Sequence, residues 1–301
     1  MSGIFGENDS TFSGGGLADE VEAQLREKRR KPRRVERLEE EGDDSAANAV
    51  EIGDAYADEG QIFQAITAYK RAANQDLRNP AHLTRLADAY TFAEMPAKAI
   101  AHYKRALKRN PHHPDTYFGL AETYRRFGRH NPALLCYQKA ISLDPDHAFY
   151  RYRMGEILCE VGLYDEGLVE LQNAVYLDPD EAFYHLCLGA TFVRLNRLPE
   201  AILQFEEAVL LSPYDDYLYA RLGAVYLMAD QPDRAVRVLR AALHLRPQMV
   251  AYHHLIAEAY TALEMEQHAA KHRVEAGDLD DYSRKFIHGL GRGLVSTPSR
   301  A

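Results

Sequence analysis

Residues 148–181 read AFYRYRMGEILCEVGLYDEGLVELQNAVYLDPDE, and residues 182–215 read AFYHLCLGATFVRLNRLPEAILQFEEAVLLSPYD. The two stretches align without a gap, and both begin with Ala-Phe-Tyr. In each half of a stretch, large apolar residues fall three and four positions apart, which places them on one face of a helix. Each stretch therefore predicts two amphipathic helices of about 14 residues joined by a turn.

The same pattern recurs every 34 residues from residue 46 to residue 283. Small residues mark the period in three series: Gly53, Ala87, Ala121, Gly155, Gly189, Gly223, Ala257; then Ala65, Ala99, Ala133, Gly167, Ala201, Ala235, Ala269; then Ala72, Ala106, Ala140, Ala174, Ala208, Ala242, Ala276. Small residues allow paired helices to approach closely, while large apolar residues fill the space beside them. Because one unit cannot bury its apolar face alone, neighbouring units are predicted to stack.

Turn residues separate the helices in this pattern. We expect a left-handed backbone between the two helices of a unit near Gly60, Gly128, Gly162 and Asn196, because glycine and asparagine tolerate that conformation. Proline closes most units and stops the second helix. These prolines are Pro111, Pro145, Pro179, Pro213 and Pro247.

The repeated residues resemble the tetratricopeptide repeat family. Its pattern has a small residue at position 8, tyrosine at 11, alanine at 20, an aromatic residue at 24, alanine at 27 and proline at 32. On this resemblance the repeats run 46–79, 80–113, 114–147, 148–181, 182–215, 216–249 and 250–283. The resemblance implies an all-α fold, a right-handed superhelical solenoid of seven repeats whose first helices line a concave groove. It also implies a non-enzymatic scaffold or adaptor that binds segments of other proteins in that groove.

The two ends of the chain depart from the pattern. Residues 1–45 are rich in Gly, Ser and charge, so we expect a disordered segment, with a fraying helix between Leu17 and Glu41 at most. Arg273 replaces a large apolar residue in the last repeat, as suits the polar face of a terminal unit. A helix over 279–290, with Phe286 and Leu290 four apart, is expected to cover the open end of the stack, and 291–301 to form a flexible tail.

The resemblance also assigns the groove. Positions 2, 5, 6 and 13 of the middle repeats give Phe118, Arg126, Phe149, Tyr152, Arg153, Phe183, Leu186, Arg194, Tyr217 and Arg221. Aromatic and arginine side chains dominate binding hot spots, so these residues predict a protein or peptide partner with apolar anchors and some acidic residues. Two alternatives stay open: the rings pack between first helices as core, and the arginines form internal ion pairs with Glu122 and Glu156.

A basic arm suggests a second function. Residues 28–34 hold six cations in seven positions, and the arm at 26–37 would suit nucleic acid or an anionic membrane surface. Three glutamates at 39–41 follow it, so a solvated charge run explains it equally well. The net charge of −9 argues against bulk nucleic-acid binding. A regulatory subunit of an enzyme complex and a homo-oligomer are further possibilities.

No motif in the sequence supports catalysis, and we expect no enzyme, cofactor or metal. His268 and His272 are four apart, which can suit a metal, but no third ligand is evident. Cys136, Cys159 and Cys187 have no metal-type spacing and are expected to be buried thiols of a cytoplasmic protein. No run of eighteen apolar residues predicts a membrane-spanning helix.

Overall fold

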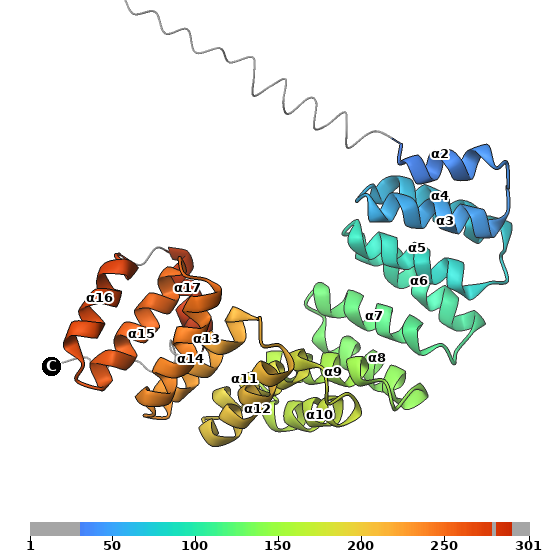
Figure 1. The fold of residues 1–301 in the computed structure, drawn as a ribbon. Coiled ribbons are helices and arrows are strands. Elements are labelled where there is room, and N and C mark those ends of the chain that lie inside the picture. Colours follow the sequence, from blue (N-terminus) through green and yellow to red (C-terminus); the bar gives the residue numbers. More distant parts are fainter. Residues whose placement is uncertain (1–30, 279–280, 291–301) are drawn as a thin grey trace, which may run out of the picture. The chain divides into compact units, whose positions relative to one another are not determined.

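The computed structural model describes residues 31–278 and 281–290, and in these residues it contains sixteen helices and no strand (Figure 1). The chain divides into two compact units, one ending at Arg129 and one beginning at His130. Its helices confirm the all-α fold that the sequence predicts.

The first unit contains α2 (Arg33–Glu40), α3 (Ala46–Asp58), α4 (Ile62–Gln75), α5 (Pro80–Phe92), α6 (Pro96–Arg109) and α7 (Pro114–Arg126). The second contains α8 (His130–Leu143), α9 (Ala148–Glu160), α10 (Tyr164–Leu177), α11 (Ala182–Arg194), α12 (Leu198–Leu211), α13 (Asp216–Met228), α14 (Pro232–Leu245), α15 (Val250–Ala262), α16 (Glu266–Ala276) and α17 (Asp281–Gly289). Within each unit, consecutive helices pack as pairs and each pair stacks on the next (Figure 1).

The small residues of the repeat lie in the core, as predicted. The alanines of the second and third series are 0–6% exposed. At the first series the contact is closest: a Cβ on Gly189 would lie 2.9 Å from the ring of Phe205, and one on Gly53 would lie 2.4 Å from the ring of Tyr69. The first helix of a pair therefore rests its backbone directly on a large side chain of the second, which fixes their separation.

Left-handed residues lie in turns between consecutive helices. Gly60, Gly128, Gly162 and Asn196 have φ between 56° and 85°, as the sequence predicts. The same conformation occurs where the sequence gives no sign of it, at Glu94, Asp230 and Glu264, with φ of 57°, 55° and 59°. After each of these residues, the next backbone N–H donates to a carbonyl five residues earlier, for example from Gln61 to Tyr56 and from Met265 to Tyr260. This hydrogen bond closes the turn whatever side chain is present.

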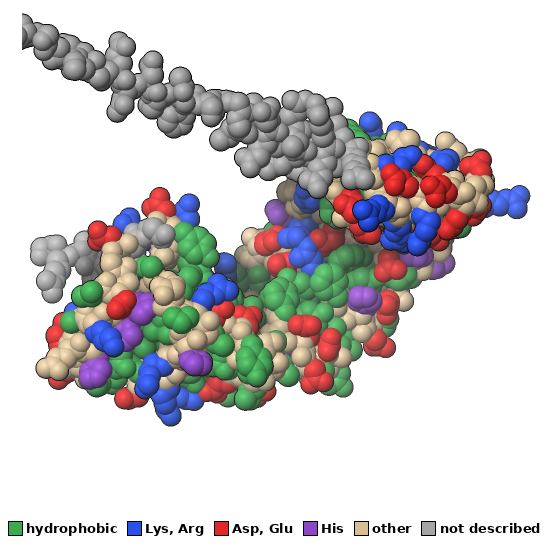
Figure 2. Space-filling model, turned by 45° about the horizontal axis from the view of Figure 1, so that its top comes forward, with side chains coloured by type: hydrophobic (Ala, Val, Ile, Leu, Met, Phe, Trp, Pro, Cys, Tyr) green, Lys and Arg blue, Asp and Glu red, His purple; other side chains and the backbone are tan. Residues whose placement is uncertain are grey.

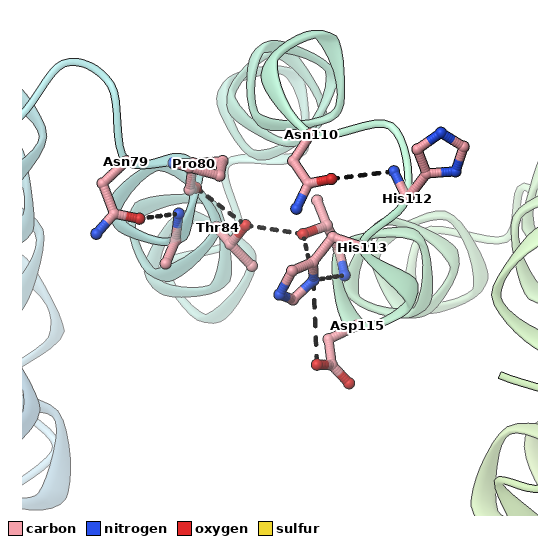
Figure 3. Close-up of polar contacts among 9 residues, drawn as sticks. Asn79, Pro80, Thr84, Asn110, His112, His113 and Asp115 are labelled. Carbon is pink, nitrogen blue, oxygen red and sulfur yellow. Dashed lines mark hydrogen bonds and ion pairs between the residues drawn. The ribbon is translucent and has the colours of Figure 1, made fainter. Parts of the chain in front are cut away.

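Side chains cap the starts of several first helices. The Asn79 side chain accepts a hydrogen bond from the Ala81 amide at 3.0 Å, and His113 Nδ1 accepts one from the Thr116 amide at 3.3 Å (Figure 3). The Thr84 and Thr116 hydroxyls then pair at 3.0 Å, which joins α5 to α7 within the first unit. Caps of this kind satisfy amides that a helix start leaves unpaired.

A recurring contact ties each first helix of the second unit to the proline before it. Arg151, His185, Tyr219 and His253 hold equivalent positions and bond the carbonyl oxygens of Pro145, Pro179, Pro213 and Pro247 at 2.9–3.2 Å. We call this contact the proline latch. The prolines thus end the second helices, as predicted, and each also presents a carbonyl acceptor to the first helix of the next pair.

The described part of the N-terminal segment contains a helix. Within residues 1–45, where we expected disorder with a helix between Leu17 and Glu41 at most, residues 33–40 form α2, whose Val35 and Leu38 are 0% and 5% exposed. Both pack against Ile52, Ala55 and Ala68. Burial of two large aliphatic side chains offsets the cost of ordering a short helix in a charged run. The predictions for residues 1–30 and for 291–301 lie outside the described residues.

Replacing Glu264 by Gly should stabilise the chain by about 1 kcal/mol, because glycine adopts a left-handed backbone without the Cβ clash. The reverse change at the equivalent position, Gly162→Ala, should destabilise it by a similar amount. Urea unfolding followed by circular dichroism measures both. A loss of stability in Glu264→Gly would contradict the backbone origin of the effect.

Candidate protein-binding surface

An aromatic face made of Phe149, Tyr152 and Phe183 lies on α9 and α11. The ring centroid of Tyr152 lies 5.7 Å from that of Phe149 and 5.2 Å from that of Phe183, the latter edge-on. Phe149 and Phe183 are 42% and 45% exposed, whereas Tyr152 is 3% exposed. Phe149 and Phe183 hold the second position of consecutive first helices, so the stacking of pairs brings these two half-exposed rings to either side of one buried ring.

Tyr152 is buried, although the sequence places it among the predicted groove residues. Tyr152 belongs to the core, where it also stacks on Tyr184 at 5.5 Å, and its hydroxyl donates to Glu156 at 3.1 Å. Leu186 is partly buried against the same core. Tyr152 therefore supports Phe149 and Phe183 from below, and these two rings are the ones that reach solvent. Hydrophobic side chains also reach the surface between charged ones on the face shown in Figure 2.

The predicted arginines differ in their surroundings. Arg153 forms an ion pair with Glu156, and its guanidinium lies 5.8 Å from the centroid of the Tyr152 ring. The internal ion pair that the sequence left open is therefore present for Arg153. Arg194, at the end of α11, is exposed. Of these two arginines, Arg153 is neutralised by an ion pair and Arg194 is exposed.

Helix α17 lies on the last two first helices of the second unit. The ring of Phe286 contacts Tyr217 of α13 at 5.7 Å and Tyr252 of α15 at 5.8 Å, and Leu290 is 0% exposed. We expected this helix to cover the end of the stack. Separately, α15 and α16 line a hollow of about 620 Å³, whose residues include Ala257 and Arg273. The α17 contacts fall on Tyr217, one of the predicted groove residues.

Arg221 lies beneath α17 and is 7% exposed. Its Nη1 donates to the carbonyl oxygen of Gly289 at 2.5 Å, and its guanidinium lies over the rings of Phe205 and Tyr217. Burial lowers the pKa of this guanidinium, and the neighbouring positive charge of Arg194 acts in the same direction. A residue predicted to meet a partner is thus covered by the chain's own C-terminal helix.

Two predicted groove residues belong to the first unit. Phe118 of α7 is partly buried. Arg126 is exposed and lies 3.6 Å from Glu94. An exposed pair at this distance contributes little to stability, so Arg126 is held only weakly.

The first unit also contains an acidic hollow of about 490 Å³ beside α2, α3 and α5. Asp54, Asp58 and Asp88 line it together with Arg34 and Arg85. Arg85 pairs with Asp54 at 2.6 Å, and Arg34 with Asp58 at 3.5 Å. Burial raises the pKa of Asp88 to about 6, against the opposing effects of the Tyr103 hydrogen bond and the Arg85 charge.

Three cations in the described part of the basic arm are engaged in ion pairs. Lys31 pairs with Glu39, and Arg37 lies 3.9 Å from Glu41. Together with the pair between Arg34 and Asp58, these contacts neutralise three cations that the arm would need for nucleic acid or a membrane. The internal charge balance that the sequence left open is therefore present over residues 31–41.

The cysteines have the character of packed thiols. Cys159 lies 3.6 Å from the Thr191 hydroxyl, and burial raises the pKa of its thiol. Burial also raises the pKa of Cys187 to about 12. Because the thiolate is the nucleophilic form, neither group is activated at neutral pH.

His268 and His272, which suggested a metal site, lie against other side chains. His272 Nδ1 lies 3.0 Å from His253 Nδ1, and His268 instead lies against the ring of Tyr260. Within residues 31–278 and 281–290, no three His, Cys, Asp or Glu side chains are arranged to hold a metal. The helices of the same residues include none that is long and apolar enough to span a membrane.

Comparison with known proteins agrees with the helix pairs. The family model described as tetratricopeptide repeat matches residues 80–146. No curated protein matches the sequence significantly.

Solved structures share the fold at low sequence identity. A tetratricopeptide repeat protein from Parabacteroides merdae is 17% identical with a TM-score of 0.56, over 81% of this chain and 98% of that one. YrrB, described as a TPR protein with an unusual peptide-binding site, is 19% identical with a TM-score of 0.52, over 67% and 99%. A chain of the APC/C hetero-tetramer Cut9-Hcn1 is 19% identical with a TM-score of 0.55, over 72% and 43%.

Replacing Asp88 by Asn should flatten the dependence of stability on pH. The folded-state pKa of about 6 lies above the ordinary value of 3.8, so the stability that Asp88 contributes is full below about pH 4 and is lost as the pH rises through 6. An amide in place of this carboxyl removes the loss, which amounts to about 3 kcal/mol at most.

Urea unfolding of both chains between pH 4 and pH 8 measures the difference, and carbon NMR of the carboxyl gives the pKa directly. Asp58→Asn, in the same hollow but exposed, is the control and should leave the profile unchanged. Titration of Asp88 at or below pH 4 would contradict the prediction.

Proposed function

We propose that this chain, whose residues 80–146 match the tetratricopeptide repeat model, is a non-enzymatic scaffold that binds a segment of another protein at the aromatic face of its second unit. The observation that carries this proposal is the exposure of Phe149 and Phe183, at 42% and 45%, on either side of the buried ring of Tyr152. Two half-exposed rings on adjacent helices provide apolar area that a folded chain would ordinarily bury.

The aromatic face has the properties of a binding hot spot. Aromatic rings lose little conformational entropy when a partner covers them, and Tyr152 and the packed core hold them in place. Arg194 adds an exposed positive charge on α11. A partner segment with apolar side chains and some acidic residues matches this combination.

YrrB, which shares the fold, has an unusual peptide-binding site, and this supports peptide or protein binding as the type of function here. The cysteines Cys136, Cys159 and Cys187 have no metal-type spacing, which supports our placing the protein in the cytoplasm. Catalysis has no support in the described residues, where the partly buried thiols of Cys159 and Cys187 are not activated.

The double substitution Phe149→Ala with Phe183→Ala should abolish capture of partner proteins, with at least a roughly tenfold loss of affinity for any partner identified. Both rings are half exposed, so helicity and melting temperature should change little. Affinity purification with quantitative mass spectrometry, followed by calorimetric titration of the enriched partner, measures the effect.

The matched control is Tyr176→Ala with Leu203→Ala, which removes two exposed apolar side chains from α10 and α12. It should leave capture unchanged. Retention of the same partners by the Phe149 and Phe183 double mutant would reject the aromatic face as the binding site.

A further inference from the structure

Helix α17 is a short element that docks through few side chains. It has nine residues, and helices of this length are marginal unless they pack on something else. Phe286 sits between the rings of Tyr217 and Tyr252, and Leu290 enters the core. Its other face is in solvent, where Tyr282 is 64% exposed. The stability of α17 therefore depends on its contacts with α13 and α15.

The docked helix leaves a buried charge poorly compensated. Arg221 is almost fully buried, and its Nη1 donates to the neutral carbonyl of Gly289 beside the neutral side chain of Tyr217. Its Nε is also buried and has no hydrogen-bond partner among the described residues. Covering a guanidinium costs free energy that a carboxylate would offset far better than a carbonyl does. The contacts of α17 therefore leave the positive charge of Arg221 without a carboxylate partner from this helix.

We propose that α17 is an internal occupant of the binding surface, displaced by a partner helix that carries an aromatic side chain and a carboxylate for Arg221. The aromatic side chain takes the place of Phe286 between Tyr217 and Tyr252. The carboxylate takes the place of the Gly289 carbonyl. The inference rests on the proposed function in one respect, since it extends the same binding surface from α11 to α13 and α15.

The energetic balance makes such an exchange workable. A tethered segment acts at an effective concentration in the millimolar range, so even a weak α17 contact keeps the site closed. A partner from solution displaces α17 only if its binding free energy exceeds that of the tethered helix. A charge-assisted hydrogen bond from Arg221 to a carboxylate of the partner supplies a contact that α17 lacks. The site therefore stays closed to apolar segments and opens to acidic amphipathic ones.

The direct test uses the chain's own helix as the probe. A fluorescent peptide of residues 277–292 is titrated into the full chain and into a chain that ends at Asp278. The peptide should bind the shortened chain at least roughly tenfold more tightly, because the tethered copy no longer competes. Equal affinity for both chains, or binding to neither, would overturn the proposal.

A second variant guards against misfolding of the shortened chain. The full chain with Phe286→Ala and Leu290→Ala keeps its length but loses both side chains that anchor α17. It should bind the peptide with the same gain over the unchanged chain. A variant with an intact melting transition and no gain would also overturn the proposal.

The carboxylate requirement is tested with two further peptides. A Cβ at Gly289 meets nothing within 4 Å, so Gly289→Glu and Gly289→Gln both fit, and they differ only in charge. On the shortened chain, the Glu peptide should bind at least about fivefold more tightly than the Gln peptide. The difference should vanish when Arg221 is replaced by Gln. Equal affinities on the chain with Arg221 would overturn the assignment of the carboxylate.

The two proposals fail separately in these experiments. Phe149→Ala with Phe183→Ala should weaken partner capture without changing the affinity of the α17 peptide for the shortened chain, because these rings lie on α9 and α11 whereas Phe286 contacts α13 and α15. Lost capture with unchanged peptide affinity supports both proposals. Retained capture rejects the aromatic face alone, and equal peptide affinity for the full and shortened chains rejects the α17 proposal alone.

Discussion

Close contact between paired helices is the constraint on which the rest of the structure depends. Where a glycine or alanine of the first helix faces a ring of the second, as Gly189 faces Phe205, there is no room for a larger side chain. The contact sets the separation of the two helices in that pair. Because pairs stack on one another within a unit, side chains at equal positions in successive first helices become neighbours. The aromatic face on α9 and α11 arises in this way.

The sequence was sufficient for the features that depend on local pattern. The buried alanines, the prolines and the glycine turns are all visible as residue types at fixed spacing. Glu94, Asp230 and Glu264 were missed because their left-handed backbone is imposed by the next residue's hydrogen bond, and their side chains give no signal. The sequence allows a helix between Leu17 and Glu41 but does not give the bounds of α2, because Val35 and Leu38 are isolated in a charged run, where two apolar residues make no recognisable period.

The site depends on contacts that no local pattern contains. Phe149 and Tyr152 are both aromatic and lie three residues apart on α9, yet one is half exposed and the other is buried. The position of Tyr184 and Phe183 on the neighbouring helix decides between them. Arg221 is covered by a segment 68 residues further along the chain. Periodicity predicts which face of a helix a residue occupies, but it cannot predict what else comes to lie on that face.

The proline latch has a consequence for how such a chain changes over time. One acceptor, a proline carbonyl, is reached by a guanidinium, two imidazoles and a phenol in four successive pairs. The proline latch requires a donor side chain long enough to reach the carbonyl oxygen from the right direction. It does not require a particular type of donor. The donor residue of each proline latch can therefore be substituted independently of the others. A chain built in this way can change its surface residues one helix pair at a time while its backbone geometry stays the same.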